Sequence, residues 1–179
     1  MKRSISKGIV NSLGWLLLLA TGLSYAAVTI ASDDTKLKAA FIFNFTKYVT
    51  WPPEVEQSNA GLKICFLGAD GIDEDLGRLS QRQVRSMNLS LIELKSTHEI
   101  DRCQLVYVMS PELAKGVINL AEKKAILTIG DGEEFADRGG VIALVREGDR
   151  IRFDINLTRA KQSRLQISSK LLQLGRKVL

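Results

Sequence analysis

The sequence predicts an α/β fold: a single domain with a mainly parallel sheet flanked by helices, a C-terminal antiparallel hairpin and a terminal helix. Between residues 62 and 129, short apolar runs alternate with segments of helical periodicity, which is the pattern of a parallel sheet with helical crossovers. The run at 105–109 is apolar throughout, as in strands covered on both faces. The runs at 141–146 and 151–156 flank a four-residue turn, so they are expected to pair antiparallel.

The first helix of this domain is expected to begin at Asp33 and Asp34, because aspartate is a favourable N-cap residue. Apolar side chains then recur at helical spacing, at Leu37, Phe41, Phe45 and Tyr48. The run Trp51-Pro52-Pro53 ends the helix, because proline lacks a backbone donor and disfavours a helical residue before it. We expect the aromatic side of this helix to pack into the core.

Strands and helices alternate regularly after this point. We expect strands at 62–67, 89–94, 105–109 and 125–129, and helices at 72–79 and 111–122, the latter capped by Ser110. After the hairpin, residues 164–176 are expected to form a final helix. Its inner side would carry Leu165, Ser168, Leu171, Leu172 and Gly175. No linker or internal repeat interrupts this pattern, so residues 34–178 are predicted to be one domain.

The first 26 residues have the organisation of a secretory signal peptide. Lys2, Arg3 and Lys7 precede an apolar core at 13–23, and small residues follow at 24–26 and again at 29–31. An uncleaved anchor is the alternative, since residues 13–31 could just span a bilayer of about 30 Å. Polar and small residues dilute that run, so we expect cleavage near residue 26, or as late as 31, and export to the periplasm.

Charge gives little support for a nucleic-acid-binding protein. The formal net charge is +5, but three of the positive charges belong to the predicted signal peptide, so the exported part is close to neutral. The remaining basic residues gather at the C-terminal end: Arg159, Lys161, Arg164, Lys170, Arg176 and Lys177. We interpret them as the solvated face of a terminal helix, with a surface for an anionic partner as the alternative.

The two cysteines are Cys65 and Cys103, and both lie in the exported part. An even number of cysteines in an oxidising compartment predicts one disulfide, which would close a loop of about 38 residues. Two buried free thiols that pack as small hydrophobic side chains are the alternative.

The sequence offers no convincing catalytic or metal-binding set. His98 is the single histidine and lacks neighbours that could complete a zinc site. Asp131, Glu133 and Glu134 follow a strand, where carboxylates could hold a cation or act as acid and base, but acidic residues also favour a helix start. The Gly68–Gly71 turn fits neither phosphate-binding loop pattern. We therefore expect a binding protein with no cofactor, not an enzyme.

Several ordered segments resemble the YfiR family of exported proteins. The opening segment 38–52 (KAAFIFNFTKYVTWP) resembles its first signature, and 64–68 and 103–107 resemble its first strand and a later strand entry, with Gln104 in place of the usual histidine. The carboxyl half matches at 127–135, 139–142, 152–156 and 167–172. The resemblance covers residues 34–178.

This resemblance implies a periplasmic regulatory protein. Family members repress an inner-membrane diguanylate cyclase by binding its periplasmic sensor region, which lowers cyclic di-GMP and biofilm formation. An outer-membrane lipoprotein can draw the repressor away, and dimerisation is common. Some relatives carry a second cysteine pair near the Gly139-Gly140 segment, but residues 135–145 contain no cysteine here. A bridge between Cys65 and Cys103 is therefore the only disulfide available to this chain.

Three hypotheses of function follow. The first is a repressor that touches its partner through the C-terminal part of the domain. Its candidate contact residues are Phe153, Ile155, Arg164, Leu165 and Ile167. The second is a periplasmic domain that senses a small molecule at the carboxyl ends of the strands. Its candidate ligand-binding residues are Gly68, Asp70, Asp131 and Glu134. The third, a hydrolase that uses the acidic cluster, has the least support.

Overall fold

The computed structural model describes residues 24–58, 60–68 and 71–179, with side chains from residue 34 onward. Residues 1–23, which hold most of the predicted signal peptide, lie outside the described residues. The signal peptide, its cleavage position and the domain bounds therefore remain predictions. The described residues form an α/β fold around a mostly parallel sheet, which confirms the predicted fold class.

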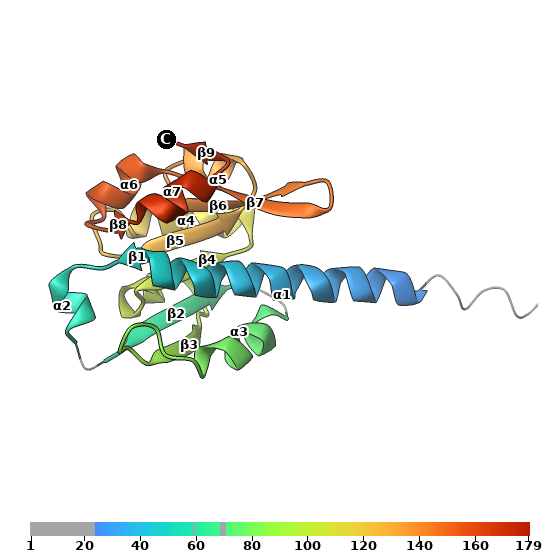
Figure 1. Ribbon diagram of the computed structural model, residues 1–179, viewed down its shortest axis with the longest axis horizontal. Coiled ribbons are helices and arrows are strands. Elements are labelled where there is room, and N and C mark those ends of the chain that lie inside the picture. Colours follow the sequence, from blue (N-terminus) through green and yellow to red (C-terminus); the bar gives the residue numbers. More distant parts are fainter. Residues whose placement is uncertain (1–23, 59, 69–70) are drawn as a thin grey trace, which may run out of the picture.

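Seven strands of the described chain form the main sheet, in the order β3-β2-β4-β5-β6-β7-β9 (Figure 1). Their bounds are β2 Leu62–Leu67, β3 Leu89–Glu93, β4 Leu105–Val108, β5 Leu127–Asp131, β6 Ile142–Glu147, β7 Arg150–Ile155 and β9 Lys177–Val178. Neighbours from β3 to β6 are parallel, β6 and β7 form the predicted antiparallel hairpin, and β9 runs parallel to β7. β5 begins two residues later than predicted, because its ladder with β4 opens at Leu127, and Asp131 is therefore its last residue.

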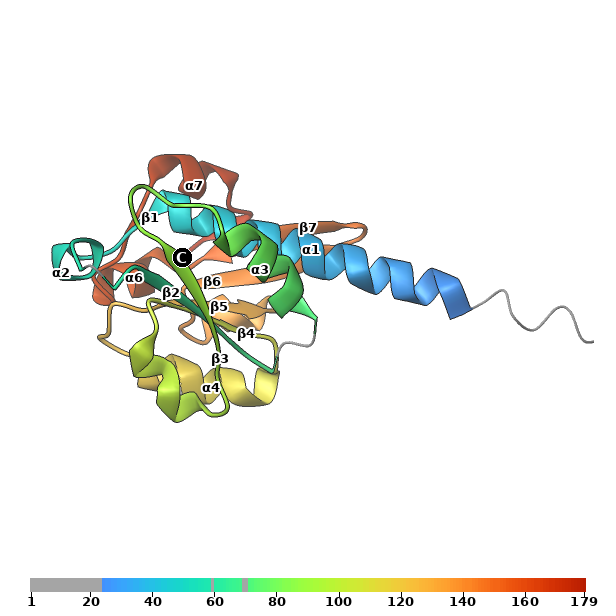
Figure 2. The same cartoon turned by 90° about the horizontal axis from the view of Figure 1, so that it is seen from below.

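Helices cover both faces of this sheet (Figure 2). α1 (Ser24–Tyr48), α3 (Ile72–Ser80) and α7 (Ser169–Leu174) lie over one face, called the α1 face below. α4 (Pro111–Leu120), the 3₁₀ helix η1 (Thr97–Arg102) and α5 (Glu134–Asp137) lie over the other, the α4 face. The shorter remaining elements are β1 (Val49–Thr50), α2 (Pro53–Glu56), α6 (Leu157–Gln162) and β8 (Gln166–Ile167), and β1 pairs antiparallel with β8.

The predicted start of the first helix at Asp33 and Asp34 is wrong. α1 is already helical at Ser24, and both aspartates lie in its interior. The preceding segment contains alanines, which have the highest helix propensity, and no residue that would break a helix, so nothing interrupts it there. The predicted end is confirmed, because α1 stops at Tyr48 just before the Trp51-Pro52-Pro53 run.

The α1 face contains the larger part of the core. Phe45 and Phe153 are buried and meet edge to face with ring centroids 5.1 Å apart, and Phe41 lies 5.9 Å from each of them. Trp51 is also buried, and its indole Nε1 donates to the carbonyl oxygen of Gln104 at 3.0 Å. Burial of an aromatic side chain contributes a large apolar area, so α1 is fixed to the sheet mainly by these rings.

The α4 face is lined by smaller side chains and carries the disulfide. β2, β4 and β6 present Cys65, Val106 and Ala143 to it, and α4 covers them with Val117 and neighbouring apolar residues. Cys65 in β2 is joined to Cys103, which directly follows η1, with 5.9 Å between the Cα atoms. The structure thus contains the disulfide predicted from the sequence, and the bridge ties the entry of β4 to its neighbour β2.

The predicted helix at 164–176 is wrong. Arg164 has a positive φ of 57°, residues 166–167 form β8, and only Ser169–Leu174 is helical. Ser168, predicted to lie inside the helix, is the N-cap of α7, and its hydroxyl accepts from the Leu171 amide at 3.3 Å. The chain then leaves the helix and adds β9 to the sheet, because the unpaired edge of β7 offers backbone partners: the Arg176 amide donates to the Phe153 carbonyl oxygen at 2.8 Å.

Candidate functional site

The carboxyl ends of the parallel strands bring a group of charged side chains together. Asp131 ends β5, and its carboxylate accepts a hydrogen bond from the Tyr107 hydroxyl of β4 at 3.0 Å. Its other oxygen lies 2.5 Å from the Nζ of Lys38 in α1. Asp131 therefore joins the sheet to the helix above it, at the edge where ligands of α/β proteins usually bind.

Tyr107 is held in its neutral form at this position. Burial, together with the nearby negative charges of Asp131 and Asp34, raises the pKa of the Tyr107 hydroxyl well above its usual value. The hydroxyl therefore stays protonated over the physiological pH range and donates a hydrogen bond to Asp131. This arrangement fixes the carboxylate but does not make Tyr107 a proton acceptor.

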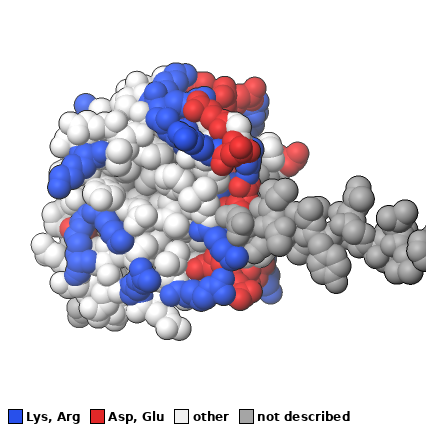
Figure 3. All heavy atoms as spheres, turned by 45° about the vertical axis from the view of Figure 1, so that its right-hand side comes forward, with Lys and Arg blue, Asp and Glu red and all other residues white. Residues whose placement is uncertain are grey.

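A second ion pair fastens α1 at the same end of the molecule. Asp34 pairs with Arg146 of β6, and this contact raises the pKa of the arginine above its usual value. Figure 1 shows the early part of α1 and the β6–β7 hairpin extending at this end. Figure 3 brings the end forward and shows basic and acidic side chains gathered around it.

A third charged group, centred on Arg176, holds the C-terminal strand. The Arg176 guanidinium makes two hydrogen bonds to the buried Asp154 carboxylate, at 2.8 and 2.6 Å. It also donates to Glu133 at 2.9 Å and to Glu147 at 3.2 Å. These carboxylates raise the pKa of Arg176, and the hydrogen bonds that Arg176 donates to Asp154 have the largest effect. Through Arg176, which directly precedes β9, the group links β7, the end of β6 and the N-cap of α5.

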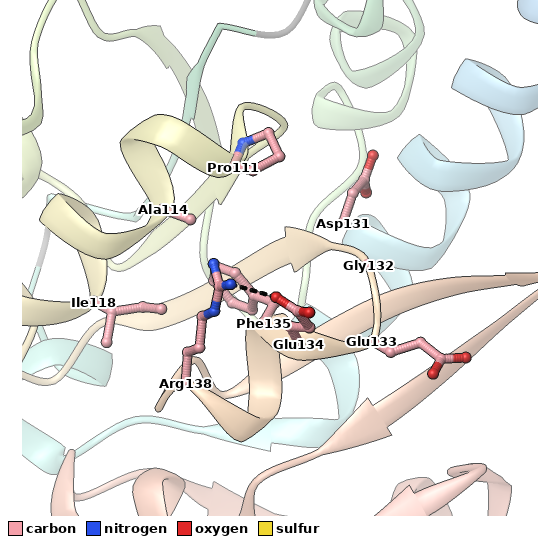
Figure 4. Close-up of a pocket in the computed structure, with 9 residues that line it drawn as sticks. All are labelled: Pro111, Ala114, Ile118, Asp131, Gly132, Glu133, Glu134, Phe135 and Arg138. Carbon is pink, nitrogen blue, oxygen red and sulfur yellow. Dashed lines mark ion pairs between the residues drawn. The ribbon is translucent and has the colours of Figure 1, made fainter.

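Two hollows adjoin the end of β5. One, of about 170 Å³, lies between α4 and α5; it is lined by Pro111, Ala114, Ile118, Asp131, Gly132, Glu133, Glu134, Phe135 and Arg138 (Figure 4). The other, of about 190 Å³, lies beneath α1; it is lined by Lys38, Asp131, Gly132, Leu144, Val145, Arg146 and Ile151. Asp131 and Gly132 therefore separate two small hollows on opposite faces of the sheet.

The wall formed by Phe135 depends on two glycines. A Cβ atom at Gly130 would lie 2.3 Å from the Phe135 ring, and one at Gly140 would lie 2.1 Å from it. Neither distance is sterically possible, so the ring can lie between these two residues only because both positions lack a side chain. Phe135 thereby fills the space next to β5 and leaves the hollow beside α4 open.

Two of the four residues predicted to bind a ligand line the same hollow. Asp131 and Glu134 both line the hollow beside α4, but Asp131 is paired with Lys38 and Glu134 with Arg138. Gly68 directly follows β2 and lines neither hollow. Asp70 lies outside the described residues. A ligand-binding role for these four residues stays a prediction.

The residues predicted to contact a partner also divide into two sets. Phe153, Ile155 and Leu165 are buried in the core of the α1 face, where their contacts stabilise the fold. Arg164 is exposed and pairs with Glu54, and Ile167 is half-buried in β8. Of the five, only Arg164 and Ile167 are accessible to a partner in this conformation.

Metal binding and catalysis gain no support from the geometry. Within the part of the chain that the structure describes, no three His, Cys, Asp or Glu side chains are grouped so that they could hold a metal ion. His98 lies exposed on η1. The acidic residues of the predicted cluster diverge, because Asp131, Glu133 and Glu134 each pair with a different basic side chain.

The sequence analysis missed the basic partners that organise these groups. Lys38 and Arg176 are distant in sequence from Asp131 and Asp154, so their proximity to these carboxylates is a product of the fold, whereas Arg138 lies four residues after Glu134 and meets it locally. Tyr107 was included only as part of an apolar strand. Its hydroxyl, in an otherwise apolar run, was the one local signal that a polar partner would be buried beside it.

Comparisons with known proteins add a family and a fold. A family model described as YfiR/HmsC-like matches residues 35–176. A conserved domain protein from Vibrio cholerae is similar in structure, with a TM-score of 0.53 and 11% identity over 81% of this chain. An ABC domain from Streptococcus pneumoniae, solved in complex with L-Trp, gives a TM-score of 0.51 and 11% identity over 79% of this chain.

The structural similarity has clear bounds. In both cases the match covers 60% of the other chain, and at 11% identity it shows the fold alone. No curated protein matches the sequence. Among the described helices, none combines the length and the hydropathy needed to cross a membrane.

Proposed function

Because this chain belongs to the YfiR/HmsC-like family of periplasmic regulators, we propose that it represses an inner-membrane diguanylate cyclase by binding the cyclase's periplasmic sensor region. Repression lowers cyclic di-GMP and with it biofilm formation. An outer-membrane lipoprotein would relieve repression by competing for the same protein. The observation that carries this proposal is the family match over residues 35–176.

Repression by binding requires a difference in affinity. A regulator shifts a cyclase toward its inactive state only if it binds that state more tightly than the active one. Each tenfold preference contributes about 1.4 kcal/mol to the shift. The surface that makes the contact must therefore read a feature that differs between the two states of the sensor region.

We assign the accessible members of the predicted contact set, Arg164 and Ile167, to one contact surface. We include in it the exposed side chains of Tyr48 and Leu174 and call it the β1–β8 surface. Ile167 pairs with Val49 across the small sheet, and α7, which carries Leu174, contacts α1, which ends at Tyr48. Tyr48 and Leu174 are two of the large apolar side chains that remain exposed, at 36% and 60%. Exposed apolar side chains beside a charged group are typical of a protein-binding surface.

Arg164 is suited to exchange partners on this surface. It pairs with Glu54, and a backbone hydrogen bond together with the Arg164 contact lowers the pKa of that carboxyl below its usual value. Both side chains are more than half exposed, and such solvent-screened ion pairs contribute little stability. A carboxylate from the sensor region could therefore replace Glu54 at little cost.

The first test is cellular. Deletion of the gene should raise cyclic di-GMP and biofilm formation, and expression of the exported protein should restore both. Unchanged cyclic di-GMP across growth conditions would contradict repression.

The second test locates the surface. Arg164→Glu should weaken binding to the purified sensor region about tenfold or more, measured by calorimetry, because a charge pair at the interface becomes repulsive. Arg102→Glu is the matched control: Arg102 is exposed to nearly the same extent, lies near a glutamate, and belongs to η1 on the α4 face. Equal affinities for both variants would exclude the β1–β8 surface. If neither the wild-type protein nor its variants bind the purified sensor region although the cell still shows repression, the partner is another protein. Homodimerisation, which the family resemblance implies, is checked by sedimentation of the same samples.

A further inference from the structure

A larger recess adjoins the hollow between α4 and α5. The hollow of about 170 Å³ at the end of β5 shares Ile118 and Arg138 with a second one of about 400 Å³, which Lys115 and Asn119 also line. The shared residues show that the second hollow lies directly beside the first along α4, and the two together are called the α4–α5 recess. Its size falls in the range of sites that bind small molecules.

The inner walls of this recess are apolar. Pro111, Ala114 and Ile118 line it from α4, and Phe135 lines it from α5. Figure 4 shows these side chains on the same side as Arg138, whereas Asp131 and Glu133 point away from it. The walls can therefore accept the apolar body of a ligand.

The carboxylates near the recess are already engaged. Asp131 is bound by Lys38 and Tyr107, and Glu133 by Arg176. Neither carboxylate can bind a cationic ligand group without losing one of these protein contacts. Glu134 is the exception, because it contacts only the exposed end of Arg138.

Two basic side chains beside the recess are available to bind an anionic ligand group. Among the described residues, Lys115 has no ion-pair partner, and Arg138 pairs only with Glu134. The side chains of Arg138 and Glu134 are 59% and 73% exposed, so this pair contributes little stability and is easily exchanged. Arginine binds a carboxylate through two parallel hydrogen bonds, which gives an incoming anion a defined orientation.

We propose that the α4–α5 recess binds a small organic monoanion with an aliphatic body. The ligand carboxylate takes the place of Glu134 on Arg138, with Lys115 as a second cation, and the aliphatic body lies against Ile118 and Ala114. Phe135 is buried and packed against the two glycines, so little of its ring is exposed to a ligand. This site lies on the α4 face, apart from the β1–β8 surface, and does not depend on the proposed repression.

The test uses the exported protein purified from bacterial periplasm. Sodium hexanoate is titrated while backbone amide signals are followed by NMR, with hexan-1-ol and sodium acetate as the arms that carry only the body or only the charge. Hexanoate should shift the signals of residues 114–119 and 134–138, and should bind at least tenfold more tightly than either arm. Equal affinity for hexanol, or shifts that centre elsewhere, would overturn the proposal.

Three variants separate a binding role from a structural one. Arg138→Gln should weaken hexanoate binding about tenfold, because it removes a charge-assisted hydrogen-bond donor. Glu134→Gln should strengthen binding by up to about fivefold, because it removes the competing carboxylate. Arg102→Gln, which is equally exposed and also near a glutamate, should have no effect. Unchanged affinity in both Arg138→Gln and Glu134→Gln would overturn the assignment, and a gain in the second cannot arise from misfolding.

Discussion

The two faces of the sheet are stabilised in different ways. On the α1 face, large aromatic side chains interlock between α1 and β7, and ion pairs fasten the helix at the strand ends. On the α4 face the side chains are smaller, a disulfide joins β2 to the start of β4, and a recess remains open along α4. The α1 face thus relies on interlocked aromatic rings, with one hollow beside Lys38, and the α4 face on a covalent bond next to smaller side chains and the larger recess.

This difference indicates where ligands and partners can act. A closely packed interior tolerates little change in volume, so the α1 face should behave as a rigid body. A face with a recess can accept a ligand without moving its strands, because the disulfide maintains their positions. The predictions below test this contrast, from the largest expected effect to the smallest.

Phe45→Ala should be the most destabilising of these substitutions. Phe45 is 1% exposed and contacts the rings of Phe41 and Phe153, so its removal leaves a cavity that the neighbours cannot fill. We expect a loss of about 3–5 kcal/mol in the free energy of unfolding, measured by urea denaturation. Phe45→Leu, which keeps most of the volume, is the control and should lose far less. A loss below 1 kcal/mol for Phe45→Ala would contradict the dense packing of the α1 face.

Loss of the disulfide should follow closely. The bridge between Cys65 and Cys103 closes a loop with a sequence separation of 38, for which chain entropy gives about 4 kcal/mol. Cys65→Ala combined with Cys103→Ala should therefore lower the free energy of unfolding by about 2–5 kcal/mol. Wild-type protein unfolded in the presence of reductant keeps both sulfur atoms, so it separates loss of the cross-link from loss of side-chain volume. An unaltered midpoint, with two titratable thiols in the untreated denatured protein, would show that no bridge forms.

Ile118→Ala should cost less than a comparable change on the α1 face. Ile118 is buried but borders the recess, so water or solvent-exposed neighbours can occupy part of the vacated volume. We expect a loss of about 2 kcal/mol, at the low end of the range for such substitutions. Ile42→Ala on α1, a fully buried position, is the matched comparison and should lose more. The reverse order would contradict the contrast between the two faces.

Tyr107→Phe should have the smallest effect at neutral pH and a distinct effect in alkali. It removes one hydrogen bond to Asp131, so we expect a loss of about 1.5 kcal/mol at pH 7. Because the pKa of Tyr107 is raised in the folded protein, the unfolded chain loses this proton first once the pH exceeds about 10. The wild type should therefore lose stability relative to Tyr107→Phe above that pH, by up to about 1.4 kcal/mol per pH unit. Parallel pH profiles of the two proteins would show that the hydroxyl is not held in this way.

The parts of the fold that were predicted correctly have local signals. The bounds of β2 match the prediction at both ends, and every end of β4, β6 and β7 lies within one residue of its predicted position. These strands were predictable because apolar runs bounded by glycine, proline or a tight turn mark strands directly. The end of α1 was marked in the same way by consecutive prolines. The prediction for the C-terminal segment was wrong because the apolar spacing of this segment fits a helix, while its actual conformation depends on backbone partners in β1 and β7.

The candidate site was predictable only in part. Asp131 was placed correctly at a strand end, but its partners Lys38 and Tyr107 are distant in sequence, and nothing in their local pattern names the carboxylate they meet. Phe153 and Ile155 were correctly assigned to one side of their strand. Alternation identifies which side chains share a face, but it does not tell whether a helix covers that face. α1 covers it here, and the side chains predicted to meet a partner lie in the core.

The sequence by itself determined the α/β class, the order of most strands and helices, the cysteine pair and the family, because each depends on residue type and short-range spacing. Only the tertiary structure decided which carboxylates Lys38, Arg146 and Arg176 meet, where the last residues join the sheet, and which apolar side chains stay exposed. Those outcomes depend on segments far apart in the chain coming together, and the free energy of such contacts is set by burial and geometry that no single segment contains.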